Sequence, residues 1–143
     1  MPRVLNAQQR GRHLEDRVVA LFKALGKWNV SRSLRIKDDR GAWSEIDVVY
    51  GWGPWRTYIE CKNYSRPVPL EAVAKFKTVL ELNHIPLRQG LFITTSTYSP
   101  RARHIGLRCL DGVELEALEA TAGRPLLRQG LTAVFMCVGA VQA

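Results

Sequence analysis

Residues 41–62, GAWSEIDVVYGWGPWRTYIECK, decide how this chain folds. Two runs within it, at 46–50 and 55–62, consist mainly of β-branched and aromatic residues with a few charged side chains between them. Glycine and proline separate the runs at 51–54, a combination that is typical of a turn between two strands. We therefore predict a β-hairpin with its turn at 51–54.

The predicted hairpin places charged side chains on one face. Because side chains alternate between the two faces of a strand, Glu60 and Lys62 point the same way. If the turn closes the hairpin symmetrically, Asp47 lies opposite Tyr58 and diagonal to Glu60, roughly 7–8 Å away. Buried carboxylates are costly unless they are paired or bind a metal ion. Oxygen ligands select hard cations, so the two acids predict a Mg²⁺ or Mn²⁺ site rather than a zinc site.

This set of residues resembles a known nuclease signature. Asp47 followed by the triplet Glu60, Cys61 and Lys62 is similar to the PD-(D/E)xK motif of restriction-endonuclease-like folds. Ile46 stands where the name of the motif has proline, at a position that varies widely within that superfamily.

The surrounding sequence is similar to the Mrr branch of that superfamily. A Gly-x-x-x-Glu pattern at 11–15 precedes the hairpin, and LFITTSTYSPRARHIGL follows at 91–107. The resemblance covers residues 8–118, predicted to be the nuclease domain, and leaves 119–143 as a C-terminal extension. It implies an α/β fold with a restriction-endonuclease-like core, in which helices flank a mixed β-sheet in the order α-β-β-β-α-β-α. Glu45, where Mrr-like chains usually carry glycine, is either an extra acid at the site or a charge at the strand edge.

The resemblance also implies which residues act in catalysis. The expected ligands of Mg²⁺, or of Mn²⁺ as a substitute, are Asp47, Glu60, the backbone carbonyl of Cys61, and Glu15. Lys62 is expected to orient and help deprotonate a water molecule, with a pKa lowered by the metal and by burial. Position alone favours Glu15 as a solvated helix residue paired with Arg12, and only the resemblance makes it a ligand.

Periodicity predicts the remaining elements. Helices are predicted at 8–25, 70–83 and 100–110, and strands at 29–37 and 90–95, the latter a central parallel strand. By resemblance, residues 113–118 form a short closing element.

Five residues are expected to contact nucleic acid: Arg101, Arg103, Arg108, Ser96 and Arg66. The first three lie on the predicted helix 100–110. The N-terminus of this helix and its arginines either bind a phosphate group or belong to an ordinary basic amphipathic helix. Ser96 follows a predicted strand end, and Arg66 lies in a polar loop beside the site. Basic residues of the strand at 29–37 either line the approach of DNA or form a solvated face.

Composition limits the class of protein. The chain of 143 residues is 46% hydrophobic, which is enough for one domain with a substantial core. The formal net charge of +8 indicates a polyanionic partner, most commonly nucleic acid, although a basic soluble domain is the simpler alternative. Three cysteines without a Cys-x-x-Cys spacing indicate neither a disulfide framework nor a zinc clip.

The same features bear on where the protein works. The free cysteines fit an intracellular, reducing compartment, cytoplasmic in a bacterium, with a mitochondrial or nuclear location open in a eukaryote. No apolar run reaches the roughly 18 residues of a membrane span, so no contact with a membrane is expected.

Trp52 and Trp55 flank the glycine-rich tip of the hairpin. Tryptophans at such a place either stack on bases or wedge into a groove of a nucleic acid, or they pack against a neighbouring element of the protein.

The sequence thus predicts a Mg²⁺-dependent DNA endonuclease that hydrolyses phosphodiester bonds in restriction or DNA maintenance. Two alternatives stay open. One is a nucleic-acid-binding module that keeps the fold without cleaving, and the other is a junction-resolving or repair endonuclease, which formation of a homodimer would favour.

Overall fold

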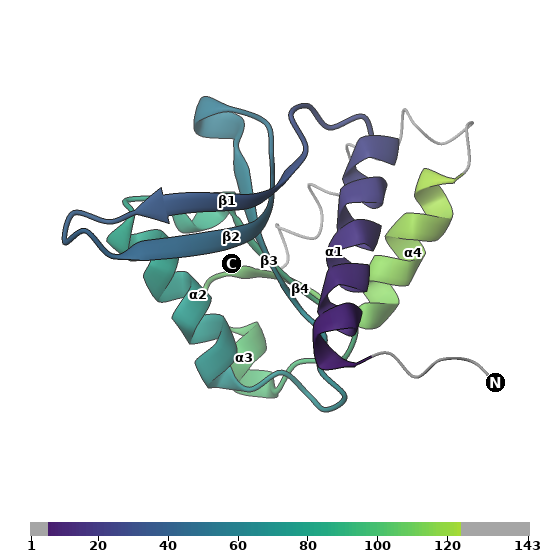
Figure 1. Cartoon of the computed structure of the whole chain (residues 1–143). Helices are drawn as coiled ribbons and strands as arrows, with labels where there is room; N and C mark the ends of the chain where they lie inside the picture. Colours follow the sequence, from purple (N-terminus) through teal and green to yellow (C-terminus); the bar gives the residue numbers. More distant parts are fainter. Residues whose placement is uncertain (1–5, 124–143) are drawn as a thin grey trace.

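A computed structural model describes residues 6–123 of the chain (Figure 1). The helices are α1 (Ala7–Ala24), α2 (Leu70–Leu82), α3 (Pro100–Arg103) and α4 (Gly112–Ala122). The strands are β1 (Ser31–Lys37), β2 (Trp43–Tyr50), β3 (Thr57–Lys62), β4 (Gly90–Thr94) and β5 (Arg108–Leu110), and two short 3-10 turns are η1 (Gly53–Trp55) and η2 (Leu87–Gln89). None of the described helices is long and apolar enough to cross a bilayer.

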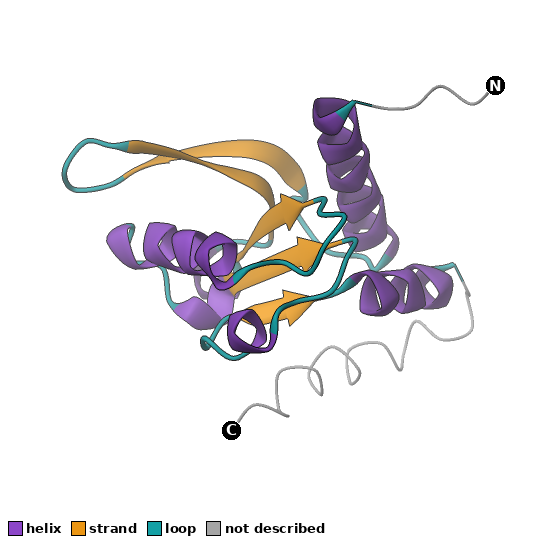
Figure 2. Ribbon diagram, turned by 90° about the horizontal axis from the view of Figure 1, so that it is seen from below, coloured by secondary structure: helices purple, strands orange, loops and turns teal. Residues whose placement is uncertain are grey.

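The strands form one mixed sheet in the order β1-β2-β3-β4-β5. The first three strands are antiparallel and include the predicted hairpin, and β4 and β5 continue parallel to β3, as predicted for the strand at 90–95. Helices cover both faces, which confirms the predicted α/β class. Figure 2 shows the β1–β2 hairpin extending as a curved arm beyond the rest of the sheet.

Two apolar cores hold the helices to the sheet. On one face, the buried stripe of α1, which includes Leu14, Val18 and Phe22, packs with α4 against strand residues such as Ile59. On the other face, α2 and α3 pack over Phe92 and its neighbours. A capping box begins α1, and the stripe at helical spacing keeps it on the sheet, so its first half lies beside the end of β3.

The loop of the β2–β3 hairpin is longer than predicted. Pairing ends at Tyr50 and Thr57, because η1 occupies the intervening segment. The ladder pairs Val48 with Ile59, so continuing it by one residue brings Asp47 level with Glu60 rather than with Tyr58. The predicted position of Asp47 opposite Tyr58 is therefore wrong, because Tyr58 pairs with Val49.

The predicted helix at 100–110 is also wrong. It ends as α3 at Arg103, Gly106 takes a positive φ of 84°, and the chain then enters the short strand β5 beside β4. A positive φ is easy for glycine and stops a helix. Residues 113–118, expected as a short closing element, belong to the longer helix α4, which Asp111 begins with a capping box. The order thus gains the strand β5 and the helix α4, and α4 crosses into the predicted extension. Residues 124–143 lie outside the described chain.

Candidate active site

The site begins where β2 and β3 stop pairing. The backbone N–H of Cys61 donates a 2.7 Å hydrogen bond to Oδ2 of Asp47. Beyond the last backbone pair of the ladder, the two strands are thus joined by a side chain. Burial and the nearby charge of Glu60 raise the pKa of Asp47 to about 6, and the Cys61 hydrogen bond only partly offsets this. Asp47 is thus an acid held close to a second acid.

A distortion of β1 accompanies Asp47. Ser33 has a positive φ of 53°, and the ladder between β1 and β2 runs from Arg32–Val48 to Leu34–Ile46 without a Ser33–Asp47 pair. A non-glycine residue in this conformation is uncommon, and such strain gathers at functional sites.

Glu60 and Lys62 do lie on the same side of β3, as predicted. Nζ of Lys62 is 2.9 Å from Oε1 of Glu60, and only 16% of the Glu60 side chain is exposed. Burial alone would lower the pKa of Lys62, but the carboxylates of Glu60 and Asp47 outweigh it and raise the pKa above the ordinary value. The expectation of a lowered pKa is therefore reversed for the protein by itself.

Glu15 shares a cleft with Asp47 and Lys62. This cleft has a volume of about 760 Å³ and lies between the first half of α1, the start of β1, the middle of β2 and the end of β3. Oε2 of Glu15 is 2.7 Å from Arg32, which also pairs with Asp16. The ion-pair partner of Glu15 is therefore Arg32 on β1, and not Arg12 as its position in the sequence suggested.

Three residues of the cleft were not assigned to the site from the sequence. Asn63 accepts a 2.8 Å hydrogen bond from Thr95, and Arg32 reaches the cleft through its ion pairs. Glu45, which the sequence left undecided, lines the cleft as well. The position of Asn63 directly after Lys62 is the one signal that could have indicated it.

The loop at the end of β4 brings two predicted nucleic-acid contacts together. The hydroxyl of Ser96 donates a 2.8 Å hydrogen bond to the carbonyl of Arg66, and the Ser96 N–H donates to Thr94. The loop after Lys62 is thereby tied to the C-terminal end of β4, next to the cleft.

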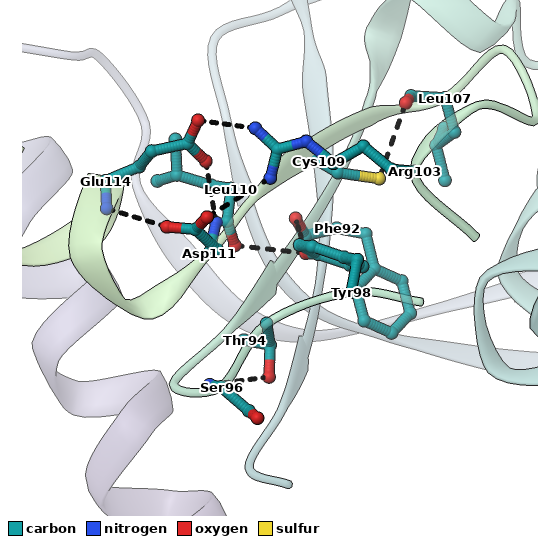
Figure 3. Close-up of polar contacts among 10 residues, drawn as sticks. All are labelled: Phe92, Thr94, Ser96, Tyr98, Arg103, Leu107, Cys109, Leu110, Asp111 and Glu114. Carbon is teal, nitrogen blue, oxygen red and sulfur yellow. Dashed lines mark hydrogen bonds and ion pairs between the residues drawn. The ribbon is translucent and has the colours of Figure 1, made fainter. Parts of the chain in front are cut away.

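The three predicted arginines have different surroundings. Arg103 forms ion pairs with Asp111 and Glu114 at the start of α4 (Figure 3). Nε of Arg108 donates to the carbonyl of Gly90, and burial lowers the pKa of its guanidinium. Arg101 alone of the three is exposed. Since α3 has only four residues, it offers no extended helix N-terminus as a phosphate seat.

The donor set fits a hard divalent cation in part. Within residues 6–123, no three acidic, thiol or imidazole side chains gather closely enough to hold a metal by themselves. Mg²⁺ in nucleotide-processing sites commonly takes one or two carboxylates and completes its shell with water and substrate phosphate. Asp47 and Glu60 supply that number of carboxylates, and Oδ1 of Asp47 makes no hydrogen bond within the described chain. Cys61 and Cys109 are free and buried, so neither thiol offers a ligand at the surface.

Solved structures share the fold. A protein of unknown function, AF1548, has 20% identity and a TM-score of 0.58, with 68% of this chain and 55% of that chain covered. Can2 from Sulfobacillus thermosulfidooxidans, in complex with cyclic tetra-adenylate, has 21% identity and a TM-score of 0.56, with 77% of this chain and 34% of that chain covered. VC1899 from Vibrio cholerae has 17% identity and a TM-score of 0.53, with 84% of this chain and 32% of that chain covered. The chain thus spans about half of the first of these proteins and about a third of the other two.

Sequence comparison shows the family. No curated protein sequence matched the chain. The family model Mrr_cat, described as restriction endonuclease, matches residues 7–122, which is most of the chain and contains both β3 and the cleft. This match confirms the resemblance drawn from the hairpin and identifies the sheet as a restriction-endonuclease-like core. The chain belongs to the Mrr-type restriction endonuclease family.

Proposed function

We propose that this protein is a Mg²⁺-dependent DNA endonuclease and that the cleft between α1 and β3 is its active site. One observation carries the proposal: two partly buried carboxylates, Asp47 and Glu60, lie beside the ammonium of Lys62 at the ends of paired strands. Burial and the charge of Glu60 raise the pKa of Asp47, an arrangement that is costly for folding alone and useful for binding a cation.

Four residues have proposed roles in holding the metal, of which Asp47, Cys61 and Glu15 line the cleft and Glu60 lies beside it in contact with Lys62. Asp47, Glu60, the carbonyl of Cys61 and Glu15 would hold Mg²⁺, for which Mn²⁺ substitutes. When bound, the ion supplies an acidified water and neutralises charge on the phosphate. The Cys61 hydrogen bond supports this by fixing one oxygen of Asp47, while the other makes no hydrogen bond within the described chain.

Lys62 has the role of a charge-stabilising group. The protein by itself raises the pKa of Lys62, so the side chain is an ammonium at neutral pH. A protonated lysine cannot accept a proton from water, but it donates hydrogen bonds to the attacking water and to the phosphate oxygens as charge develops on them. We therefore assign positioning of water and electrostatic stabilisation to Lys62, and not general-base catalysis.

The outer face of the β1–β2 arm is the proposed approach for the DNA backbone. The guanidinium of Arg35 lies 4.9 Å from the ring centre of Trp43, and Nζ of Lys37 lies 5.5 Å from it. Arg35 pairs across the hairpin with Glu45, which lines the cleft. This basic face is thus continuous with the proposed active site, and a two-stranded ribbon is a shape that the major groove accepts.

A cleavage panel tests the proposal. Linear, circular, branched and methylated DNA, together with RNA, would be incubated with the protein in Mg²⁺, Mn²⁺ or EDTA, with Asp47→Asn as the inactive control. We expect metal-dependent cleavage of at least one DNA form and none with the variant. Cleavage that persists in EDTA or in Asp47→Asn would contradict the assignment of the site.

A further inference from the structure

Three exposed tryptophans gather at the end of the molecule opposite the proposed active site. Trp28, Trp52 and Trp55 are 72%, 55% and 71% exposed. Together with Tyr50 and Lys27 they line a second cleft of about 360 Å³, here called the aromatic cleft. Large exposed aromatic side chains are unusual on a protein surface, and a cluster of them marks an interaction site.

The strand β3 and the helix α1 both separate the two clefts. Trp55 precedes β3 and Lys62 ends it, so the strand places them roughly 17–20 Å apart along its length. The active-site cleft lies against the first half of α1, and the aromatic cleft begins just after the other end of this 18-residue helix. Different residues therefore form the two clefts at opposite ends of the same elements.

The loop that carries the tryptophans is firmly anchored. The buried amide of Gln89 donates hydrogen bonds of 3.0 Å to the carbonyls of Gly53 and Arg56. The N–H of Gly51 donates to the carbonyl of Trp28, which joins the two sides of the cleft. Gly51 has a φ of 74°, and a Cβ there would lie 2.6 Å from the carbonyl oxygen of Trp55. The indoles are thus displayed by a loop of defined shape and are not exposed through lack of structure.

The ring geometry provides flat apolar surfaces. Trp52 and Trp55 meet edge to face with their centres 5.6 Å apart. Tyr50, only 6% exposed, lines the cleft, and its ring centre lies 4.7 Å from that of the core residue Phe22 with the two planes tilted by 32°. The volume lies within the range of small-ligand pockets, about 300–1,000 Å³. A flat ring is the ligand shape that such surfaces accept.

The positive charge of Lys27 determines which aromatic ligands suit the aromatic cleft. Nζ of Lys27 lies 5.5 Å above the Tyr50 ring, and none of the residues lining the aromatic cleft is acidic. Aromatic cages for quaternary ammonium groups rely on attraction of a cation, which Lys27 opposes. A lysine in the same cleft as exposed indoles favours a ligand that joins a flat ring to a negative charge.

The geometry points to the aromatic cleft as a binding site for an unpaired base of single-stranded nucleic acid, with Lys27 near its phosphate. Bases within a duplex are already stacked on each other, whereas an unpaired base exposes the face that stacks on tryptophan. This inference rests on the nucleic-acid partner of the proposed function but not on cleavage. It adds a contact to a strand end, gap or displaced strand, away from the proposed active site.

Fluorescence anisotropy of labelled oligonucleotides in EDTA tests the inference. The protein would carry Asp47→Asn to prevent cleavage, and a Trp52→Ala/Trp55→Ala form would be compared with Trp52→Phe/Trp55→Phe, which keeps flat rings. Val113→Ala, which removes another exposed apolar side chain, is the matched control. We expect the alanine form to lose about fivefold or more in affinity for single-stranded DNA, as for one lost stacked base, with duplex affinity within twofold. The phenylalanine form should recover most of the loss.

Several outcomes would overturn the inference. Unchanged single-strand affinity in the alanine form would do so, and a simultaneous change in oligomeric state would identify the cleft as a protein interface. Equal losses for duplex and single-stranded DNA would also contradict it. Thermal melts verify that each variant is folded. If the wild-type protein cleaves no DNA but binds single strands through its tryptophans, the proposed function fails and this inference stands.

Discussion

The backbone N–H of Cys61 and the carboxylate of Asp47 are joined by a 2.7 Å hydrogen bond where the β2–β3 ladder ends. This bond fixes the acid of one strand against the strand that carries Glu60 and Lys62. Two acids are thereby held together at the edge of a cleft, a state that burial and like charge both disfavour.

Asp47→Asn should stabilise the metal-free protein at high pH. The pKa of Asp47 rises from 3.8 to about 6 on folding, so the folded state binds the proton more tightly and its stability falls as pH rises between about 4 and 6. Asparagine keeps an acceptor for Cys61 and removes the charge. We expect a gain of about 1–3 kcal/mol in the free energy of unfolding at pH 8. Urea titrations at pH 8 and pH 4 measure it, and an equal gain at both pH values would contradict the cause given.

Mg²⁺ should bind the wild-type protein and not Asp47→Asn. The variant loses the charge of one proposed ligand, while its affinity for DNA in EDTA should be equal or higher because a repulsion of phosphate is removed. Calorimetric titration with Mg²⁺ decides the first point. Unchanged Mg²⁺ affinity in the variant would remove Asp47 from the ligand set.

Arg103→Gln should affect stability more than DNA binding. Arg103 contacts both residues of the capping box that begins α4, Asp111 and Glu114, so its loss should cost about 1 kcal/mol. Arg101→Gln, at an exposed position, should change stability by less than about 0.5 kcal/mol. Denaturation and DNA-binding curves for both variants provide the comparison. A stable Arg103→Gln with weakened DNA binding would show that Arg103 contacts phosphate after all.

DNA binding should depend strongly on salt, because the basic surface displaces counterions from phosphate. Lys37→Gln on the β1–β2 arm should reduce the slope of log affinity against log salt by about one. Lys75→Gln on the exposed side of α2 is the charge-matched control and should leave the slope unchanged. Equal effects of the two variants would indicate that net charge, and not the arm, directs binding.

The sequence predicted those parts of the site that depend on local periodicity. Alternation along β3 was sufficient to place Glu60 and Lys62 together, and their 2.9 Å contact confirms it. The register of Asp47 was missed because η1 lengthens the hairpin loop, and a 3-10 turn leaves no periodic signal. The pairing of Glu15 with Arg32 joins separate elements, so no spacing within either element could indicate it.

The error at residues 100–110 has a similar origin. Ser99 and Pro100 begin a helix, as their capping signal predicts, and Ser99 does accept a hydrogen bond from Ala102. Termination depends on Gly106 and on the opportunity for Cys109 to pair beside Phe92 in the sheet. A strand as short as β5 is determined by its neighbour, and its own residues carry too little pattern to reveal it.

Single-turnover cleavage by Lys62→Ala tests the central claim most directly. Wild type, Lys62→Ala and the surface control Lys75→Ala would be measured in Mg²⁺ and in EDTA, together with their affinities for DNA and Mg²⁺. Wild type and control should cleave only with the metal, and Lys62→Ala should be slower by about 10²–10³, as for the loss of a group that stabilises developing charge, with little change in either affinity. If wild type cleaves no form of DNA with any metal, and Lys62→Ala merely binds DNA a few-fold more weakly, the cleft is not a nuclease active site.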